Sequence, residues 1–427
     1  MKNNLYYIKR HIFDKVAKHL SNKEMTVIIG PRQVGKTVLL KQLREFLLTE
    51  KKITPENIYN FNLDIIFDRT LFDSQTDFIK FVKQRSVKSK IYVFIDEAQK
   101  INNAGVFLKG VFDSDLNAKF VLTGSSALEI KAKIQESLTG RKRLFHLLPF
   151  SLLEIINYKN PALFSVLAKN KKIAKRDNAE VLDILEDYCL YGGYPQVVLA
   201  DDVSEKISYL GEIFTSYIER DVIGFLRIEN ENNFIKLVKL LAAQIGRLIV
   251  VGELSVAVNT DRYTIDRYLA SLEKTFINYR LKPHFKNARQ EIVKAEKSFF
   301  IDNGLRNFGL NKFQTPFIER EDSGELLENM IFKELLVLKH EKNFNLKFWR
   351  TKQGAEVDFV VENGLDILPI EVKSNLHNDN IATGLVGFIS SHNPPRALVV
   401  NLKYQGKRII GKTEVYFILP YELGAYF

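Results

Sequence analysis

The stretch VIIGPRQVGKT, residues 27–37, places a glycine-rich turn between two apolar segments. Its first three residues predict the end of a buried strand, and the following VLLKQLREFLL, residues 38–48, has the apolar spacing of a helix. Between these segments, Gly30 to Thr37 satisfies the pattern G-x-x-x-x-G-K-[ST]. A strand, a loop and a helix in this order are the context in which the pattern indicates a phosphate-binding loop.

The residue types of this loop suggest how it would hold a nucleotide. Gly30 and Gly35 permit backbone angles that expose successive N–H groups, which form a concave anion site together with the helix N-terminus. We expect Lys36 to bridge the β- and γ-phosphates of ATP and Thr37 to hold Mg²⁺. The other residues assigned to this nucleotide site are Pro31, Arg32, Gln33, Val34 and Val38.

Two acidic residues follow a second apolar stretch. The sequence IYVFIDE, residues 91–97, predicts a buried parallel strand with carboxylates at its C-terminal edge. Ligands bind at that edge in open α/β sheets. We therefore expect Asp96 to support Mg²⁺ through water and Glu97 to orient the attacking water, although a solvated acidic pair is the simpler alternative.

Hydroxyl groups and an arginine complete the predicted nucleotide site. The apolar run 119–122 is followed by Thr123, Ser125 and Ser126, and we assign Ser125 to the γ-phosphate or the attacking water. Capping of the next helix is the alternative role for such hydroxyls. Arg141 is a candidate arginine finger, acting within the chain or on a neighbouring subunit, while a plain surface arginine fits the sequence equally well.

Composition limits the class of protein. A chain of 427 residues is long enough for two or three domains, and its net charge of +11 favours an acidic partner such as nucleic acid. The single cysteine, Cys189, excludes an intramolecular disulfide and suits a reducing compartment. No apolar run reaches the roughly 18 residues of a membrane helix, and the first residues lack the apolar core of a signal peptide. We therefore expect a cytoplasmic protein without a membrane partner.

The middle of the chain predicts three helices and a hairpin, which is the order of a winged helix with its third helix as the recognition helix. Arg262, Arg267 and Lys274 on that third helix favour DNA, whereas Asp261 and Asp266 dilute its positive charge. A winged helix that binds protein, or that is purely structural, therefore stays open. The three helical stretches are 234–243, 251–258 and 261–274.

Acids and a lysine recur near the C-terminus. A strand and a turn precede ILPIEVK, residues 367–373, where the strand period of two puts Glu371 and Lys373 on one face. Pairing across the hairpin would bring Asp358 beside them. Asp358 and Glu371 would then bind Mg²⁺, Lys373 would position water, and Glu328 would be an outer metal ligand from a helix. Acids that are merely solvated at a hairpin edge are the alternative.

The order of the motifs resembles a known family. GPRQVGKT, FIDEAQK, LTGSSA and LTGR followed by LLPFSLLE look like prokaryotic AAA-type ATPases, and more specifically like ATP-binding proteins with a C-terminal domain of unknown function. The resemblance covers nearly the whole chain and includes GGYP at 192–195 and FIDNGL at 300–305. It implies the AAA+ superfamily and ATP with Mg²⁺, and it allows a homo-oligomer, but it supplies no substrate.

The C-terminal acids carry a second resemblance. Their order, with EVDFVV at 356–361 and PIEVKS at 369–374, is similar to the (D/E)…D…(D/E)xK signature of the restriction-endonuclease-like superfamily. We therefore predict an α/β protein in four parts. These are a P-loop AAA+ core with a parallel sheet at 1–150, a helical lid or linker at 151–230, a winged-helix-like region at 231–320 and a restriction-endonuclease-like domain at 321–427.

Two functions remain open at this point. The first is a Mg²⁺-dependent ATPase that acts on or with DNA and carries a nuclease-like C-terminal domain. The second is an ATP-dependent switch whose C-terminal domain binds a protein or DNA without cleaving it. A transporter or a metabolic phosphate-transfer enzyme is disfavoured, because the sequence marks no membrane span and no small-molecule acceptor site.

Overall fold

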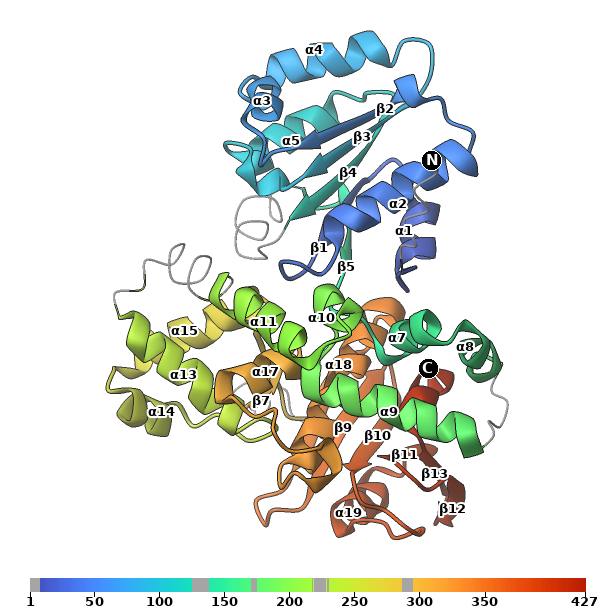
Figure 1. Cartoon of the computed structure of the whole chain (residues 1–427), viewed down its shortest axis with the longest axis vertical. Coiled ribbons are helices and arrows are strands. Elements are labelled where there is room, and N and C mark those ends of the chain that lie inside the picture. Colours follow the sequence, from blue (N-terminus) through green and yellow to red (C-terminus); the bar gives the residue numbers. More distant parts are fainter. Residues whose placement is uncertain are drawn as a thin grey trace. The chain divides into compact units, whose positions relative to one another are not determined.

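The computed structural model describes residues 8–124, 138–169, 175–216, 218, 228, 230–285 and 295–427. The chain folds as two units, of which the first contains residues 1–148 with the segment 274–276, and the second contains 149–273 and 277–427. Figure 1 labels their helices and strands. The four-part division expected from the sequence stays a prediction.

A five-stranded sheet forms the centre of the first unit, in the order β2-β3-β4-β1-β5. All neighbouring strands are parallel, as the sequence predicts. Since β4 lies between β1 and β3, the phosphate loop after β1 and the acids at the end of β3 share one edge of the sheet. The strands are β1 (Met25–Ile29), β2 (Ile58–Asn62), β3 (Ile91–Asp96), β4 (Ala118–Gly124) and β5 (Lys142–His146).

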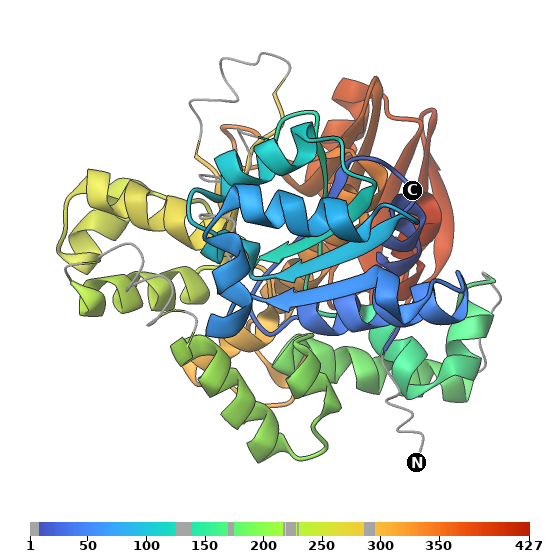
Figure 2. The same cartoon turned by 90° about the horizontal axis from the view of Figure 1, so that it is seen from above.

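Helices cover both faces of this sheet. Met25, Val27 and Ile29 of β1 turn to the face that packs with α4 and α5. Thr26 points to the opposite face and contacts His19 of α1, with Oγ1 and Nδ1 2.8 Å apart. Figure 2 shows α4 and α2 on opposite sides of the strands. The elements are α1 (Phe13–His19), α2 (Lys36–Thr49), α3 (Ile66–Arg69), α4 (Gln75–Arg85), α5 (Ala104–Asp113) and the 3₁₀ segments Pro55–Asn57, Thr70–Phe72 and Ala98–Lys100.

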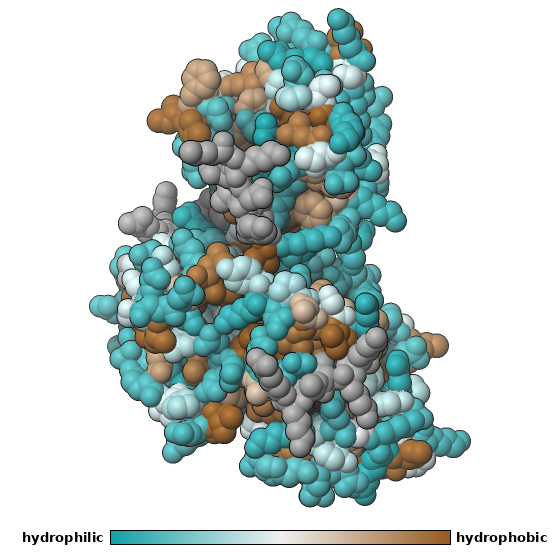
Figure 3. Space-filling view, turned by 45° about the vertical axis from the view of Figure 1, so that its right-hand side comes forward, coloured by the Kyte–Doolittle hydropathy of each residue, from teal (hydrophilic) through white to brown (hydrophobic). Residues whose placement is uncertain are grey.

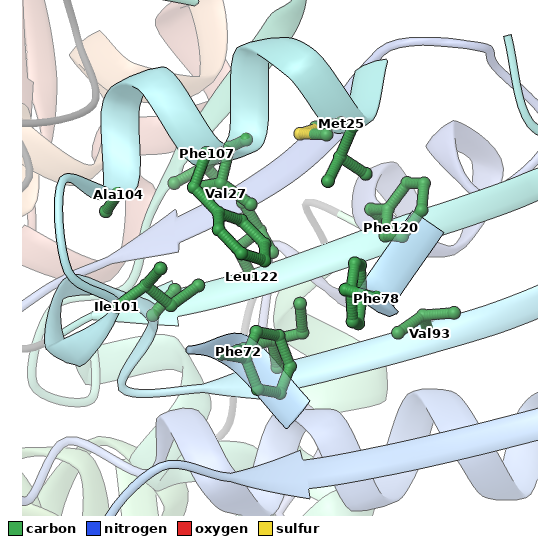
Figure 4. Packing of buried hydrophobic residues seen from close by; sticks show 14 of the residues in the cluster. Met25, Val27, Phe72, Phe78, Val93, Ile101, Ala104, Phe107, Phe120 and Leu122 are labelled. Carbon is green, nitrogen blue, oxygen red and sulfur yellow. The ribbon is translucent and has the colours of Figure 1, made fainter. Parts of the chain in front are cut away.

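Aromatic rings fill the core under α4 and α5 (Figure 4). The ring centroids of Phe72 and Phe78 lie 4.8 Å apart, and those of Phe78 and Phe107 lie 5.6 Å apart. Burial of each such side chain contributes about 1.5–3 kcal/mol to the free energy of unfolding. This packing holds α4 and α5 against the strands whose ends carry the candidate nucleotide site.

Helices make up the first part of the second unit. Two of them, α14 and α15, are separated only by residues 259–261, and a two-stranded antiparallel hairpin follows α15. The helices are α7 (Leu152–Lys159), α8 (Pro161–Leu167), α9 (Lys175–Tyr191), α10 (Pro195–Leu199), α11 (Val203–Phe214), α13 (Glu231–Ala243), α14 (Val251–Val258), α15 (Arg262–Lys274) and α17 (Asn303–Leu310), and the hairpin strands are β6 (Asn278–Leu281) and β7 (Lys297–Phe300).

Three of the recognised sequence motifs meet at Asp302. Its buried carboxylate accepts hydrogen bonds from the backbone N–H of Gly193 at 2.7 Å and from that of Gly304, at the start of α17, at 2.9 Å. The carbonyl of Gly193 in turn accepts from the N–H of Phe150 at 2.7 Å. A Cβ on Gly192 would lie 2.0 Å from Asp302 Oδ1, and the φ of Gly192 is +77°, so the turn requires glycine. The GGYP motif therefore has a structural role here.

A mixed six-stranded sheet forms the last part of the second unit, in the order β12-β13-β11-β10-β9-β8. Phe332 of α18 packs against Phe359 of β9, with centroids 6.4 Å apart, while Phe388 of α19 joins a core cluster with Val357 and Val360. The elements are α18 (Ser323–Lys342), α19 (Thr383–His392), β8 (Asn345–Arg350), β9 (Glu356–Asn363), β10 (Asp366–Lys373), β11 (Arg396–Asn401), β12 (Gly406–Ile410), β13 (Thr413–Ile418) and the 3₁₀ segments Phe317–Glu319 and Pro420–Tyr426.

The fold is thus mixed α/β, with a parallel N-terminal sheet, a helical middle and a mixed C-terminal sheet. The face in Figure 3 is mostly hydrophilic, with apolar residues in small scattered groups. Within the described residues, every helix is too short or too polar to cross a membrane.

Candidate functional site

The phosphate loop links β1 to α2 with a curled backbone. Gln33 has a φ of +59° and Gly35 a φ of +91°, and positive angles of this kind turn successive N–H groups toward a common centre. A Cβ on Gly30 would lie 1.9 Å from the carbonyl oxygen of Leu147, so this position excludes any side chain. Because α2 begins at Lys36, the positive end of its dipole also faces the loop. The loop therefore has the geometry of an anion site.

The ammonium group of Lys36 lies over this loop. Its Nζ donates to the carbonyl oxygens of Gly30 at 3.1 Å and of Pro31 at 2.7 Å, and the residue is only 6% exposed. Phosphate oxygens would offer this buried cation stronger, charge-assisted partners than neutral carbonyls do. Of the other residues assigned to this site, Pro31 and Val34 are buried, whereas Arg32, Gln33 and Val38 are exposed.

Asp96 joins the loop to the ends of two strands. The hydroxyl of Thr37 donates to Asp96 Oδ2 at 2.6 Å, and the hydroxyl of Thr123 donates to the other carboxylate oxygen. Thr123 Oγ1 also accepts from the backbone N–H of Glu97 at 3.2 Å. A carboxylate and a hydroxyl beside a phosphate loop are hard oxygen donors that fit Mg²⁺, with phosphate oxygens and water as its remaining ligands. Ser125, the residue that we assigned to the γ-phosphate, lies outside the described residues.

Glu97 has an unusual backbone conformation. Its φ of +56° lies in the left-handed region, which costs a residue other than glycine about 1–3 kcal/mol and is frequent at functional sites. The carboxylate of Glu97 accepts a hydrogen bond from the side-chain amide of Gln99, which is 5% exposed. Gln99 thereby orients the predicted catalytic acid. The sequence analysis missed this contact, because a glutamine two residues along the chain carries no recognisable signal.

Arg141 requires a correction. Its carbonyl accepts from the N–H of Met25, the first residue of β1, so Arg141 lies at the amino edge of the sheet. The phosphate loop is at the other edge, roughly 13 Å away for a strand of this length. The guanidinium group is paired with Asp113, with Nε and Oδ1 2.8 Å apart. An arginine finger within the chain is therefore wrong in this structure, because parallel pairing of β5 with β1 fixes the edge at which β5 begins. The role toward a neighbouring subunit stays a prediction.

A second arginine, Arg10, was missed. It is 4% exposed, and its guanidinium group donates to the carbonyl oxygens of Val34 at 2.8 Å and of Leu148 at 2.5 Å. It therefore braces the phosphate loop against the segment that follows β5. No motif surrounds Arg10 in the sequence, so only the fold reveals this position.

The C-terminal acids come from three elements of the second unit. Glu328 lies on α18, Asp358 on β9, and Glu371 and Lys373 on β10. Lys373 Nζ is 2.7 Å from Glu371 Oε1, and Asp358 Oδ2 accepts from the backbone N–H of Val372 at 2.8 Å. Burial raises the pKa of Asp358 and raises that of Glu371 to about 7, and the charge of Asp358 adds to the shift of Glu371. The structure thus brings the acids and the lysine together, with Glu371 buried and Lys373 partly exposed.

A lysine that we did not predict lies among these acids. Lys297 of β7 has its Nζ 3.1 Å from Glu328 Oε1 and forms a second ion pair with Glu356. Burial lowers its pKa, but the charges of Glu328, Asp358 and Glu356 outweigh burial and leave the pKa above its ordinary value. Burial also raises the pKa of Glu328 to about 8, against the opposing charge of Lys297.

The expected metal ligands Glu328, Asp358 and Glu371 stay a prediction. In the part of the chain that the structure describes, no three His, Cys, Asp or Glu side chains form a group that could hold a metal ion. Lys297 brings a positive charge into the region where these acids lie.

The basic residues that predict a DNA contact lie on the exposed side of α15. Arg262, Asp266 and Arg267 are exposed, as is Tyr263. Asp261 caps the helix, because its carboxylate accepts from the backbone N–H of Thr264 at 2.9 Å. One of the two acids that dilute the basic charge in the sequence thus has a local structural role.

Three family models match successive parts of the chain. A family model described as an AAA domain matches residues 22–156, and models of two domains of unknown function, DUF8612 and DUF4143, match residues 182–315 and 323–423. An uncharacterised protein of Haemophilus influenzae is 27% identical over 405 residues, which is 92% of each chain. Uncharacterised protein MJ1544 of Methanocaldococcus jannaschii is 29% identical over 351 residues, 81% of this chain and 73% of that protein.

Solved structures give more distant likenesses. The Aeropyrum pernix ORC2 protein in its ADP form has a TM-score of 0.37 at 14% identity, covering 72% of this chain and 95% of that one. The Aeropyrum pernix ORC1 protein in complex with DNA has a TM-score of 0.32 at 11% identity, covering 73% and 94%. Likenesses this distant do not bear on function. The match to the AAA domain model spans all five strands of the parallel sheet of the first unit.

Proposed function

We propose that this protein is a Mg²⁺-dependent ATPase of the AAA type. The observation that carries the proposal is the 2.6 Å hydrogen bond from Thr37 to Asp96, which joins the phosphate loop to the acidic strand end. Nucleotide hydrolysis needs phosphates, a cation and a water-activating group at one place. Here the loop, Lys36, Asp96 and Glu97 are all at the same edge of one sheet.

Each residue has a distinct part in the proposed reaction. Lys36 exchanges its carbonyl partners for phosphate oxygens and stabilises the charge that develops during transfer. Thr37 and Asp96 hold Mg²⁺, which supplies further charge neutralisation when it is bound. Glu97 accepts a proton from the attacking water, and its contact with Gln99 sets the direction of its carboxylate.

We further propose that the protein acts with DNA. The net charge of +11 and the exposed Arg262 and Arg267, which follow the short turn between α14 and α15, support this part of the proposal. A helix after such a turn can enter the major groove, with basic residues on phosphates. A winged helix that reads DNA is accordingly our assignment for α13, α14, α15 and the hairpin.

The test measures DNA binding and DNA-stimulated ATP turnover together. In Arg262→Ala/Arg267→Ala we expect weaker binding to duplex DNA and a smaller salt dependence, because each lost phosphate contact removes counterion release. The matched control is Lys236→Ala/Lys239→Ala, which removes the same charge from exposed positions on α13. Equal losses of DNA affinity in both double variants would show that the effect comes from the net charge and not from α15. Unchanged ATP turnover with every form of DNA would contradict a DNA-linked ATPase.

The C-terminal domain supports a second candidate, a restriction-endonuclease-like nuclease. The observation that favours it is the pair of Glu371 and Lys373, 2.7 Å apart, beside Asp358. Purified wild type would be given linear, supercoiled, single-stranded and branched DNA with ATP and Mg²⁺ or Mn²⁺. Cleavage that disappears in Asp358→Ala would support the nuclease. No cleavage, or cleavage that survives this substitution, would contradict the nuclease. The remaining hypothesis would be an ATP-dependent switch whose C-terminal domain binds a partner without cleaving it.

A further inference from the structure

Strand geometry directs Lys297 toward the C-terminal acids. Lys297 pairs with Leu281 across the β6–β7 hairpin and forms a bridge with Leu248 on its other side. Side chains two residues apart on a strand share a face. Phe299 stacks on Phe332 of α18, with centroids 4.5 Å apart, so Lys297 faces α18 as well. The β6–β7 hairpin thus places the ammonium group of Lys297 beside carboxylates of α18 and β9.

The ammonium group of Lys297 is paired with two acids. Its Nζ is 3.1 Å from Glu328 Oε1 and closer still to Glu356 Oε1, and it lies 5.6 Å from the centroid of the Phe348 ring. The side chain is 2% exposed. Burial of an unpaired ammonium group would strongly destabilise the folded state. The ion pairs with Glu328 and Glu356 therefore stabilise the buried lysine and the acids together.

The same hairpin closes the site on two sides. The N–H of Gly246 donates to the carbonyl of Ser298 at 2.8 Å, and a Cβ on Gly246 would lie 2.8 Å from Glu328 Oε2. The other hairpin arm extends along β8, because the N–H of Phe348 donates to the carbonyl of Lys282 at 3.0 Å. The backbone of the hairpin that carries Lys297 is therefore hydrogen-bonded to neighbouring segments on both sides.

We propose that the ammonium group of Lys297 is the resident cation of the Glu328, Asp358 and Glu371 site, and that a divalent cation such as Mn²⁺ or Mg²⁺ binds there only when this lysine is absent or withdrawn. A second observation points to a ligand. Glu371 Oε2 is buried and has no hydrogen-bond partner among the described residues, although Oε1 of the same group is paired with Lys373. The inference depends on the acids of the nuclease candidate but not on cleavage or on ATP turnover.

Charge explains why the two cations exclude each other. An ammonium group among the acids repels a divalent ion, and Lys297 takes up one oxygen that would ligate it, Glu328 Oε1. Removal of Lys297 leaves the same oxygens with less compensation, and these are the hard donors that Mg²⁺ and Mn²⁺ prefer. The same acids would then bind a divalent ion in place of the ammonium group of Lys297.

The experiment compares Mn²⁺ binding to the full-length wild type, Lys297→Met and Lys282→Met, without nucleotide. Lys282 is exposed on the same hairpin, so its substitution is the matched control. We expect Lys297→Met to bind one more Mn²⁺ than the wild type, at least tenfold tighter than any site of Lys282→Met. The added Asp358→Ala substitution should abolish the gain. Thermal unfolding should show Mn²⁺ stabilising Lys297→Met and not the wild type.

Three results would overturn the proposal. One is a wild-type Mn²⁺ site that Asp358→Ala removes, since the lysine would then not block the metal. Another is a folded Lys297→Met that gains no Mn²⁺ site. The third is that both Lys297→Met and Lys297→Gln fail to fold even with Mn²⁺, because the lysine would then be irreplaceable by a metal. DNA cleavage and ATP turnover are measured separately, so their absence would affect only the proposed function.

Discussion

The two acidic sites of this chain compensate their charge in opposite ways. Asp96 in the first unit accepts hydrogen bonds from two neutral hydroxyls, those of Thr37 and Thr123. The acids of the second unit are instead matched by ammonium groups, Lys297 at Glu328 and Lys373 at Glu371. Neutral donors orient a carboxylate and leave its charge for an incoming cation, whereas a buried lysine already supplies that cation. Similar acids are thus matched by neutral donors in one site and by positive charges in the other.

Assembly differs between the two sites as well. The nucleotide site is built at one sheet edge from strand ends and the loops that follow them. The C-terminal site draws on α18, β9 and β10, and it receives its additional cation from β7. A site at one sheet edge follows from the order of strands, while the second site depends on how a separate hairpin packs.

The largest expected effect is the loss of ATP turnover when the lysine of the phosphate loop is replaced. We expect Lys36→Ala to reduce ATP turnover to background, because the ammonium group that lies over this loop and would hold the phosphates is then lost. The measurement is phosphate release together with nucleotide binding by calorimetry. Lys41→Ala, at an exposed position on the same helix, is the control and should keep wild-type turnover. ATP turnover in Lys36→Ala close to that of Lys41→Ala would contradict the role assigned to Lys36 and the contrast between the two sites.

The next effect sharpens the role of the strained acid. We expect Glu97→Gln to lower turnover about 100-fold or more while ATP still binds, because the amide cannot accept a proton from water. Glutamine can still hydrogen-bond with Gln99, so the local geometry should be kept. Single-turnover hydrolysis and equilibrium binding would be measured on the same preparation. Hydrolysis at the wild-type rate would show that Glu97 has been assigned the wrong role.

The smallest effect tests the buried acids through pH. Burial raises the pKa of Glu328 to about 8 and that of Glu371 to about 7, above their values in the unfolded chain. The folded second unit then binds more protons at these two groups than the unfolded chain does, so the free energy of unfolding of this unit should fall as pH rises from about 5 to 8. The slope is at most about 1.4 kcal/mol per pH unit for each group. Urea unfolding would be followed by the fluorescence of Trp349, the single tryptophan, which lies on β8.

The control for this prediction is Glu328→Gln, which removes one of the two titrating groups. Its pH dependence between about 5 and 8 should be shallower than that of the wild type. A free energy of unfolding that rises with pH in this window would mean that the lysines outweigh burial. The contrast drawn between the two sites would then lose its electrostatic basis.

Much of the first unit could be predicted from local patterns. An apolar run followed by a glycine-rich turn specifies a strand end and a phosphate loop within a few residues, and IYVFIDE places Asp96 at the end of another strand. Parallel strands then bring both ends to one edge, which is the edge that the structure gives them. The edge at which Arg141 lies did not follow in the same way, because it depends on the pairing of β5 with β1.

The sequence by itself determined the phosphate loop, the acidic strand end and the face shared by Glu371 and Lys373, because each is set by spacing along a single element. Only the tertiary structure decided the partners of those groups. Arg10 against the loop, Arg141 against Asp113 and Lys297 against Glu328 join segments that are far apart in the chain. A charged residue at ordinary spacing carries no mark of its partner, because that partner is chosen by packing and by the need to compensate a buried charge.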